Sequence, residues 1–188
     1  MRLLGLSGSL RRDSHNTRLL RAAAAKLPPG AELVVWPELA AIPPFSEDDE
    51  AGAVPPAVAR LRHAVAGAHG VLVSTPEYNG SIPGQLKNAL DWLSRPWETN
   101  VLRDRPVAAV GASTGLFGAV WAQADLRRVL ETIGASVIDA ELPVGQAHEA
   151  FTLRGDLRDP GADAALAELV DELVRRSGER VVPQLRAA

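Results

Sequence analysis

Residues 3–17 read Leu3-Leu4-Gly5-Leu6 followed by Ser7-Gly8-Ser9-Leu10-Arg11-Arg12-Asp13-Ser14-His15-Asn16-Thr17, and an alanine- and leucine-rich stretch comes next. A short apolar run, a polar loop and a helix-forming stretch predict a β-strand, a turn and an α-helix. Glycine lets a ligand approach the backbone, hydroxyl and amide side chains can donate hydrogen bonds, and the arginines supply positive charge. With the free N–H groups of the helix start, this loop is expected to bind an anion, above all a phosphate.

The loop departs from the two best-known nucleotide-binding patterns. No Gly-Lys-Ser/Thr follows the glycine, and the full G-x-G-x-x-G spacing is missing. Neutral donors around one cation suit a terminal monoester phosphate, which carries about −1.5 to −2 charges. A structural interpretation stays open beside this one, in which the loop is simply the N-cap of a helix and its arginines are solvated.

The composition excludes several classes of protein. The chain has no cysteine, which excludes disulfides, thiolate metal sites and cysteine nucleophiles, so any redox chemistry needs a cofactor. The net charge of −3 comes without a long basic block, which argues against a nucleic-acid partner. No apolar run approaches the ~20 residues that span a bilayer, and the first apolar stretch is too short for a signal sequence. We therefore expect a soluble, cytoplasmic protein with neither a nucleic-acid nor a membrane partner.

Short apolar runs alternate with longer stretches of helical periodicity, which predicts βαβ units, a parallel sheet and an α/β fold. The expected strands are residues 3–8, 32–36, 70–75, 106–111 and 136–140. The expected helices are residues 17–27, 55–68, 83–94, 120–133 and 163–177. No internal repeat or long linker divides the chain, so we expect a single domain over residues 1–188.

The longest irregular stretch, residues 37–54, contains the acidic run Glu47-Asp48-Asp49-Glu50. The run lacks the alternating ligands and the glycine of a calcium loop, and no metal site is expected. We interpret the stretch as a solvated, mobile loop, whose length suggests a place at the mouth of a site or at a subunit contact.

A second informative segment begins where the third expected strand ends and reads Thr75-Pro76-Glu77-Tyr78-Asn79-Gly80-Ser81-Ile82-Pro83. Ligands of open α/β sheets bind outside the carboxyl ends of the strands, so this loop and the first one should lie side by side. Tyr78 is the only tyrosine, and the following Asn-Gly pair permits the positive φ angles of a tight turn. We expect Tyr78 to touch a ligand, although a purely structural turn ahead of a helix is the other interpretation.

A third loop, Ala112-Ser113-Thr114-Gly115-Leu116-Phe117-Gly118, follows the fourth expected strand at the same edge of the sheet. Its small residues allow a flat ring to lie against the backbone, and a simple connection explains them equally well.

Together the segments resemble the NADPH-dependent FMN reductases, a family whose relatives include bacterial quinone, chromate and azo-dye reductases. The likeness covers most of the chain. Its strongest parts are Gly8-Ser9-Leu10-Arg11 with Ser14 and Asn16, and Pro76-Glu77-Tyr78-Asn79 with Ser81, Pro83, Gly84, Leu86-Lys87-Asn88 and Asp91-Trp92.

This resemblance implies a flavodoxin-like, three-layer sandwich, in which a five-stranded parallel sheet of order 2-1-3-4-5 carries helices on both faces. It also implies bound FMN. The residues carried over to the FMN phosphate are Ser9, Arg11, Ser14, Asn16 and Thr17. Those carried over to the isoalloxazine are Pro76, Glu77, Tyr78, Asn79 and Gly80, with Ser113, Thr114 and Gly115 at the pyrimidine edge. His15 fills a position where variation is expected and is assigned no role.

The resemblance further implies an enzyme, an NAD(P)H-dependent FMN or quinone reductase. In a two-step, ping-pong cycle, NADPH or NADH passes hydride to FMN and leaves. A quinone, flavin, chromate, azo or similar small-molecule acceptor then binds where the nicotinamide was and is reduced by the FMN. The FMN carries this chemistry, so no side chain is expected to be catalytic. A homodimer, in some cases paired into a homotetramer, is implied as well, with Trp92, Trp97 and Trp121 as interface candidates of which at least one belongs to the core.

Two other functions compete with this one. A non-enzymatic FMN electron carrier serving protein partners is disfavoured, because flavodoxins usually combine a phosphate loop without arginine with a strongly acidic surface. A nucleotide-binding regulator without a redox role predicts a colourless protein that takes up no FMN.

Overall fold

The computed structural model describes residues 1–179, and its centre is a parallel sheet in the order β2-β1-β3-β4-β5. This confirms the order 2-1-3-4-5 expected from the resemblance. The strands are Arg2–Ser7 (β1), Glu32–Val35 (β2), Gly70–Thr75 (β3), Pro106–Ala112 (β4), Ser136–Val137 (β5) and a short strand beside β4, Pro143–Val144 (β6).

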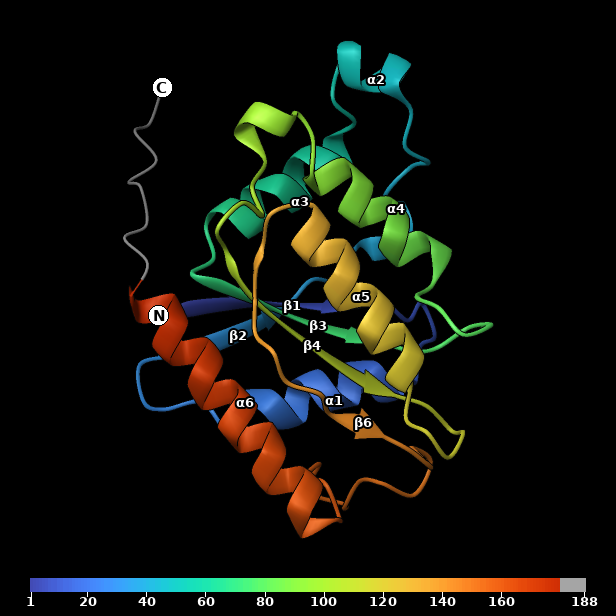
Figure 1. Ribbon diagram of the computed structural model, residues 1–188, viewed down its shortest axis with the longest axis vertical. Helices are drawn as coiled ribbons and strands as arrows, with labels where there is room; N and C mark the ends of the chain where they lie inside the picture. Colours follow the sequence, from blue (N-terminus) through green and yellow to red (C-terminus); the bar gives the residue numbers. More distant parts are fainter. Residues whose placement is uncertain (180–188) are drawn as a thin grey trace.

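Helices cover both faces of the sheet and make the molecule three layers thick (Figure 1). They are His15–Ala24 (α1), Glu47–Ala51 (α2), Pro56–Ala66 (α3), Gly84–Leu93 (α4), Val120–Thr132 (α5) and Pro160–Glu179 (α6), with 3₁₀ turns at Leu39–Ala41 (η1) and Trp97–Thr99 (η2). All five helices expected from the periodicity are present. The first begins two residues earlier than predicted, because the Ser14 hydroxyl accepts a hydrogen bond from the Thr17 N–H and caps the helix at that point.

Successive residues of the central strands point to opposite faces and so build two cores. Leu4 and Leu6 of β1 pack in the core with α3, α4 and α5, whereas Leu3 packs in the core with α1 and α6. Because β1, β3 and β4 are buried on both faces, their sequences are continuous apolar runs rather than alternating ones.

The fifth strand is shorter than the predicted residues 136–140. Only Ser136 and Val137 pair with the start of β4, and the chain then leaves the sheet and returns as β6 opposite the end of β4. In the gap, the side chain of Gln123 on α5 accepts a hydrogen bond from the Leu142 N–H at 3.1 Å. The prediction was too long because the Ala140 N–H bonds to the nearby Ile138 carbonyl at 2.9 Å and the backbone turns away from β4 there, a local bend that strand propensity does not reveal.

Residues 37–54 contain regular structure that the sequence did not predict, although α2 within them has no buried residue, in line with the solvated loop that was expected. The carbonyl of Pro43 accepts hydrogen bonds from the Trp92 indole (2.9 Å) and the Asn88 amide (2.8 Å), and Phe45 packs edge-on against the Trp92 ring. The acidic run itself forms α2, where carboxylates at a helix N-terminus are favoured by the helix dipole. Glu50 of α2 then pairs with Arg95 at 2.9 Å, so this segment is fastened to α4 and to the chain that follows it.

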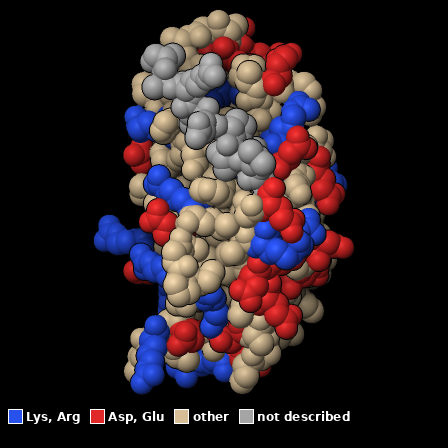
Figure 2. Space-filling view, turned by 90° about the vertical axis from the view of Figure 1, so that its left-hand side faces the viewer, with Lys and Arg blue, Asp and Glu red and all other residues tan. Residues whose placement is uncertain are grey.

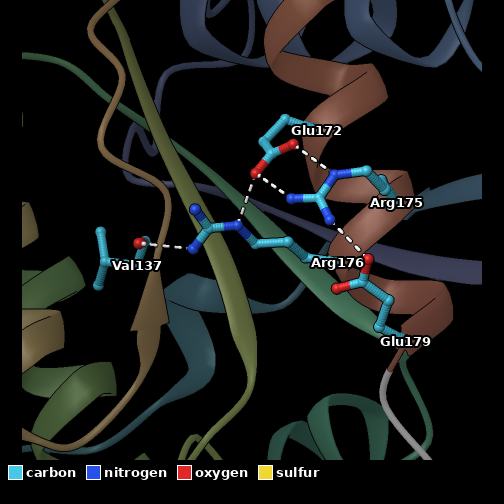
Figure 3. A network of polar contacts seen from close by, with 5 residues as sticks. All are labelled: Val137, Glu172, Arg175, Arg176 and Glu179. Atoms are coloured by element: carbon cyan, nitrogen blue, oxygen red, sulfur yellow. Dashed lines mark hydrogen bonds and ion pairs between the residues drawn. The ribbon is translucent and has the colours of Figure 1, made fainter.

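Helix α6 carries a network of charges on its surface (Figure 3). Glu172 accepts hydrogen bonds from Arg175 and Arg176, and Arg175 also pairs with Glu179. These partners lie three and four residues apart, the spacing that places side chains on one helix face. The face turned to the viewer in Figure 2 accordingly shows acidic and basic side chains close together rather than one broad region of a single charge.

None of the helices within residues 1–179 has both the length and the apolar character needed to cross a membrane.

Candidate functional site

The loops that follow β1, β3 and β4 meet at the carboxyl edge of the sheet, because these three strands are neighbours. They line one cavity of about 120 Å³, whose walls are Ser9, Arg11, His15, Asn16, Pro76, Glu77, Tyr78, Ala112, Ser113 and Thr114. Eight of these ten belong to the site predicted from the sequence. The other predicted residues, which do not line this cavity, are Ser14, Thr17, Asn79, Gly80 and Gly115.

The first loop presents unused hydrogen-bond donors at the start of α1. Within residues 1–179, the backbone N–H groups of His15 and Asn16 have no acceptor, as expected for the first turn of a helix. Arg11 is exposed and forms no ion pair within the same part of the chain. A positive helix end, free N–H groups and a guanidinium without an ion pair in the described residues are features that favour an anion.

Asn16 has a structural role that the sequence did not reveal. Its side chain is buried, donates to the Ala112 carbonyl at 2.9 Å, and accepts from the Ala112 N–H at 3.0 Å and the Ser74 hydroxyl at 2.8 Å. These bonds join the start of α1 to β3 and β4. The amide oxygen and one amide N–H are therefore committed to holding α1 against β3 and β4, and the second amide N–H and the backbone N–H of Asn16 have no acceptor within the described residues.

Two hydroxyl residues of the first loop, Ser14 and Thr17, do not line the cavity but stabilise the conformation of the loop. Ser14 caps α1, and the Thr17 hydroxyl donates to the Ser7 hydroxyl at 3.1 Å. Thr17 faces instead a neighbouring cavity of about 330 Å³, which also includes Arg11, Arg21 and Trp36 among its lining residues.

The second loop folds into the tight turn that the Asn-Gly pair predicted. Tyr78 and Ser81 exchange backbone hydrogen bonds at 3.0 and 3.2 Å, and the two residues between them have φ angles of 54° and 76°. Positive φ at both central positions is the geometry of a type I′ turn. Tyr78 is 51% exposed, which confirms that it is not a core residue. The N–H groups of Asn79 and Gly80 have no acceptor within the described chain and remain available.

Two side chains fasten this turn to α5. Glu77 accepts a hydrogen bond from the Ala122 N–H at 3.0 Å, and Ser81 donates to Asp125 at 2.5 Å. Helix α5 is preceded by Ala119 at the N-cap position, which has a left-handed φ of 63° and cannot cap the helix with its own side chain. Glu77 supplies the missing cap from another loop. The hydrogen bond from Ser81, followed by that from Arg128, lowers the pKa of Asp125, so this carboxylate is ionised.

The third loop is held by backbone bonds to the segment that contains β6. Ser113 donates its N–H to Val144 and accepts from the N–H of Ala147, both at 3.0 Å. The exposed residues that follow, Leu116, Phe117 and Trp121, are large and apolar, and the two rings pack edge-on at 5.2 Å between centroids. The sequence analysis did not predict that Leu116 and Phe117 would be exposed next to the site.

Comparison with known proteins agrees with this geometry. A family model described as NADPH-dependent FMN reductase matches residues 1–149. The chain is 38% identical to an NAD(P)H-dependent FMN reductase of Pseudomonas aeruginosa over 92% of this chain and 93% of that protein. It is 34% identical to an NADPH:quinone oxidoreductase of Arabidopsis thaliana over 100% of this chain and 91% of that protein.

Solved structures show the same fold. FerB, a flavoenzyme NAD(P)H:(acceptor) oxidoreductase from Paracoccus denitrificans, matches with a TM-score of 0.83 and 32% identity over 95% of this chain and 97% of that one. An NADH:FMN oxidoreductase in its apo form matches with a TM-score of 0.68 at 19% identity over 97% of this chain and 91% of that one, a likeness of fold alone. By its matching family model and these relatives, the chain belongs to the NADPH-dependent FMN reductase family and is an FMN-dependent NAD(P)H oxidoreductase.

Proposed function

We propose that the three loops at the carboxyl edge hold FMN and expose its ring to NAD(P)H and then to an electron acceptor. The observation that carries the proposal is the shared cavity, which collects eight predicted residues from three loops far apart in the sequence. In this proposal the FMN phosphate is held by Ser9, Arg11, Ser14, Asn16 and Thr17. The isoalloxazine is lined by Pro76, Glu77, Tyr78, Asn79 and Gly80. The pyrimidine edge of the ring is approached by Ser113, Thr114 and Gly115.

The residues present fit such a cofactor. A phosphate needs donors and positive charge, and the N–H groups of His15 and Asn16 with the unpaired Arg11 offer both. An aromatic ring system needs a flat apolar contact and a few polar groups, and the exposed Tyr78 with the free N–H groups of the following turn offers these. The roles differ within the set: Asn16 and Ser14 contribute mainly by shaping the loop, and Glu77 by fixing the turn to α5.

When bound, FMN supplies the hydride-transfer chemistry. The chain's own residues bind and orient: the first loop anchors the phosphate, and the 78–81 turn sets one side of the ring pocket. Free backbone N–H groups of Asn79 and Gly80 are preorganised donors that favour negative charge developing near them. Because Tyr78 lies at an open surface, donor and acceptor can occupy the same place in turn, which is the basis of a two-step cycle.

Quinone-type compounds are the acceptor class that this proposal favours, because relatives of the chain are named as quinone oxidoreductases and reductases. We assign the enzyme to the cytoplasm, where NAD(P)H is available and a chain without cysteine needs no oxidising compartment. The second candidate function is that of an electron carrier for protein partners, and the open surface around Tyr78 favours it. The assay described below distinguishes this function from that of a reductase.

The same proposal describes the chain as one FMN-binding domain that forms a homodimer. Both cores pack on the two faces of one sheet, which supports the single domain. Leu116, Phe117 and Trp121 are 72%, 61% and 53% exposed beside the site, and apolar side chains gathered at a surface favour a protein contact. Trp92 is fully buried and belongs to the core, whereas Trp97 is exposed and remains an interface candidate.

Absorbance and turnover test the function. Purified protein, loaded with FMN and desalted, should retain on the order of one FMN per chain and absorb at about 450 nm. Oxidation of NADPH or NADH should then depend on added quinone, and double-reciprocal plots at several quinone concentrations should be parallel. If the protein retains FMN but oxidises neither NADPH nor NADH, the electron-carrier function is supported and the reductase function is overturned. A protein that takes up no FMN would overturn both of these functions.

A further inference from the structure

His15 is the first residue of α1 and lines the cavity formed by the three loops. Its Nδ1 atom is buried and has no hydrogen-bond partner within the described residues. Within the described residues, two other buried side-chain polar atoms also lack a hydrogen-bond partner. They belong to Trp36 and Ser177, neither of which lines this cavity. A buried polar atom without a partner is destabilising. Because the residue that carries this atom lines the cavity, a ligand bound there is the partner that we consider.

The charges around His15 are mostly positive. Burial lowers the pKa of its imidazole, and Arg11, Arg18 and His148 lower it further. Arg11 and Arg18 belong to the first loop and α1, whereas His148 comes from the chain after β6. Arg18 lies over the Phe151 ring at 4.5 Å, and the carboxylate of Glu77 lines the same cavity but is engaged with α5. In the protein without a ligand, all of these causes favour the neutral imidazole.

We propose, on the basis of the proposed function, that His15 is a phosphate-binding residue of the FMN site and that it takes up a proton as FMN binds. The phosphate would bring its negative charge to the N-terminus of α1, where His15 stands beside Arg11. A nearby negative charge favours the charged form of histidine. Nδ1 then donates to a phosphate oxygen, which gives the buried atom its partner.

The sign of the pH dependence follows from linkage. If binding raises the pKa of His15, the complex holds more protons than the free protein, and affinity for FMN increases as the pH falls. Each unit by which that pKa rises corresponds to about tenfold in affinity between the deprotonated and protonated limits. Protonation of the FMN phosphate itself, with a second pKa of about 6, works in the opposite direction, so the comparison must be made between variants at each pH.

The experiment measures FMN dissociation constants of the apoprotein by quenching of flavin fluorescence, from about pH 8 to about pH 5.5. The wild type is compared with His15→Asn, which keeps a donor near Nδ1 but no titratable charge, and with His15→Leu, which keeps neither. His63→Asn is the matched control, because His63 is exposed on α3 and away from the cavity. Riboflavin, which lacks the phosphate, is titrated in parallel.

We expect the ratio of the His15→Asn constant to that of the wild type to rise about tenfold as the pH falls through this range. The His15→Leu constant should exceed that of the wild type at every pH, by roughly tenfold or more at the acidic end. His63→Asn should match the wild type, and riboflavin should bind all four proteins alike. Calorimetry in two buffers of different ionisation enthalpy should show proton uptake for the wild type and none for His15→Asn.

A ratio that stays constant with pH, or an equal loss of riboflavin affinity in His15→Leu, overturns the role of His15 while leaving the FMN site intact. A wild type that binds neither flavin overturns the proposed function along with it.

Discussion

At the scale of single residues, the two arginines of the first loop are adjacent in sequence but not equivalent in structure. Arg11 lines both cavities that flank the loop, whereas Arg12 lines neither. We predict that Arg11→Ala weakens FMN binding by about 1.5–3 kcal/mol, because a charge-assisted bond to the phosphate is lost. Arg12→Ala is the matched control and should change the FMN dissociation constant far less. Equal losses in the two variants would show that only general positive charge matters.

Asn16 gives a second prediction at this scale, this time for stability. Asn16→Ala leaves Ser74 and both backbone groups of Ala112 without their partner. Each buried group left unpaired costs about 1–3 kcal/mol, so urea unfolding of the apoprotein should show a loss of about 3 kcal/mol or more. Asn79→Gly, at an exposed position with positive φ, should change the free energy of unfolding by less than about 0.5 kcal/mol. A small loss for Asn16→Ala would mean that water replaces the amide.

At the scale of elements, the turn that contains Tyr78 and helix α5 behave as one unit. We predict that Ser81→Ala and Asp125→Ala each weaken FMN binding, because each frees one side of the turn from the helix. A double-mutant cycle should give a coupling energy of about 0.5–3 kcal/mol in the free energy of unfolding. The Asp125 pKa is lowered in the folded protein, so its contribution is present above pH 3.8 and is lost as the pH falls below that value. Additive effects of the two substitutions would contradict the link.

The charge network of α6 predicts a pH dependence that does not involve the site. Hydrogen bonds from Arg175, and then from Arg176, lower the pKa of Glu172 from 4.5 to about 2. A folded-state pKa below the unfolded one stabilises the fold above pH 4.5, and that stabilisation is lost between pH 4.5 and about pH 2. The wild type should therefore unfold at a higher temperature than Glu172→Gln at neutral pH, and the difference should shrink through this window. The network is exposed, so salt should also reduce the difference; a difference independent of pH would contradict the assignment.

The elements also show where prediction from sequence succeeds. The strands β1, β3 and β4 and all the expected helices follow from apolar periodicity, although the start of α1 was placed two residues too late. The predicted length of β5 was wrong, and the regular structure within residues 37–54 was missed. The backbone turns away from β4 at the local bond between Ala140 and Ile138, and the carbonyl of Pro43 is held by the side chain of Trp92, which is distant in sequence.

At the scale of the whole molecule, the exposed apolar residues beside the site predict association. Phe117→Ser combined with Trp121→Ser should shift the protein from dimer towards monomer in sedimentation velocity, because both rings are lost from one surface. Leu153→Ser is the control, since Leu153 is also an exposed apolar residue but lines a different cavity, together with Arg18 and Arg21. A wild type that is monomeric at all concentrations would overturn the proposed dimer, and a dimer unaffected by the double substitution would place the interface elsewhere.

By itself, the sequence determined the alternation of strands and helices, the loop with Arg11, the tight turn after Tyr78 and, through its likeness to a family, the use of FMN. These features depend on local propensity, spacing and residue type, all of which can be read from residues close together in the sequence. Only the tertiary structure decided how the loop residues are used: Asn16 joins the start of α1 to β3 and β4, Glu77 caps a helix of another segment, and His15, which lines the cavity, has a buried nitrogen without a partner among the described residues. The reason is that a hydrogen bond is satisfied by whichever group the fold brings within reach, and that choice is made across the sheet rather than along the chain.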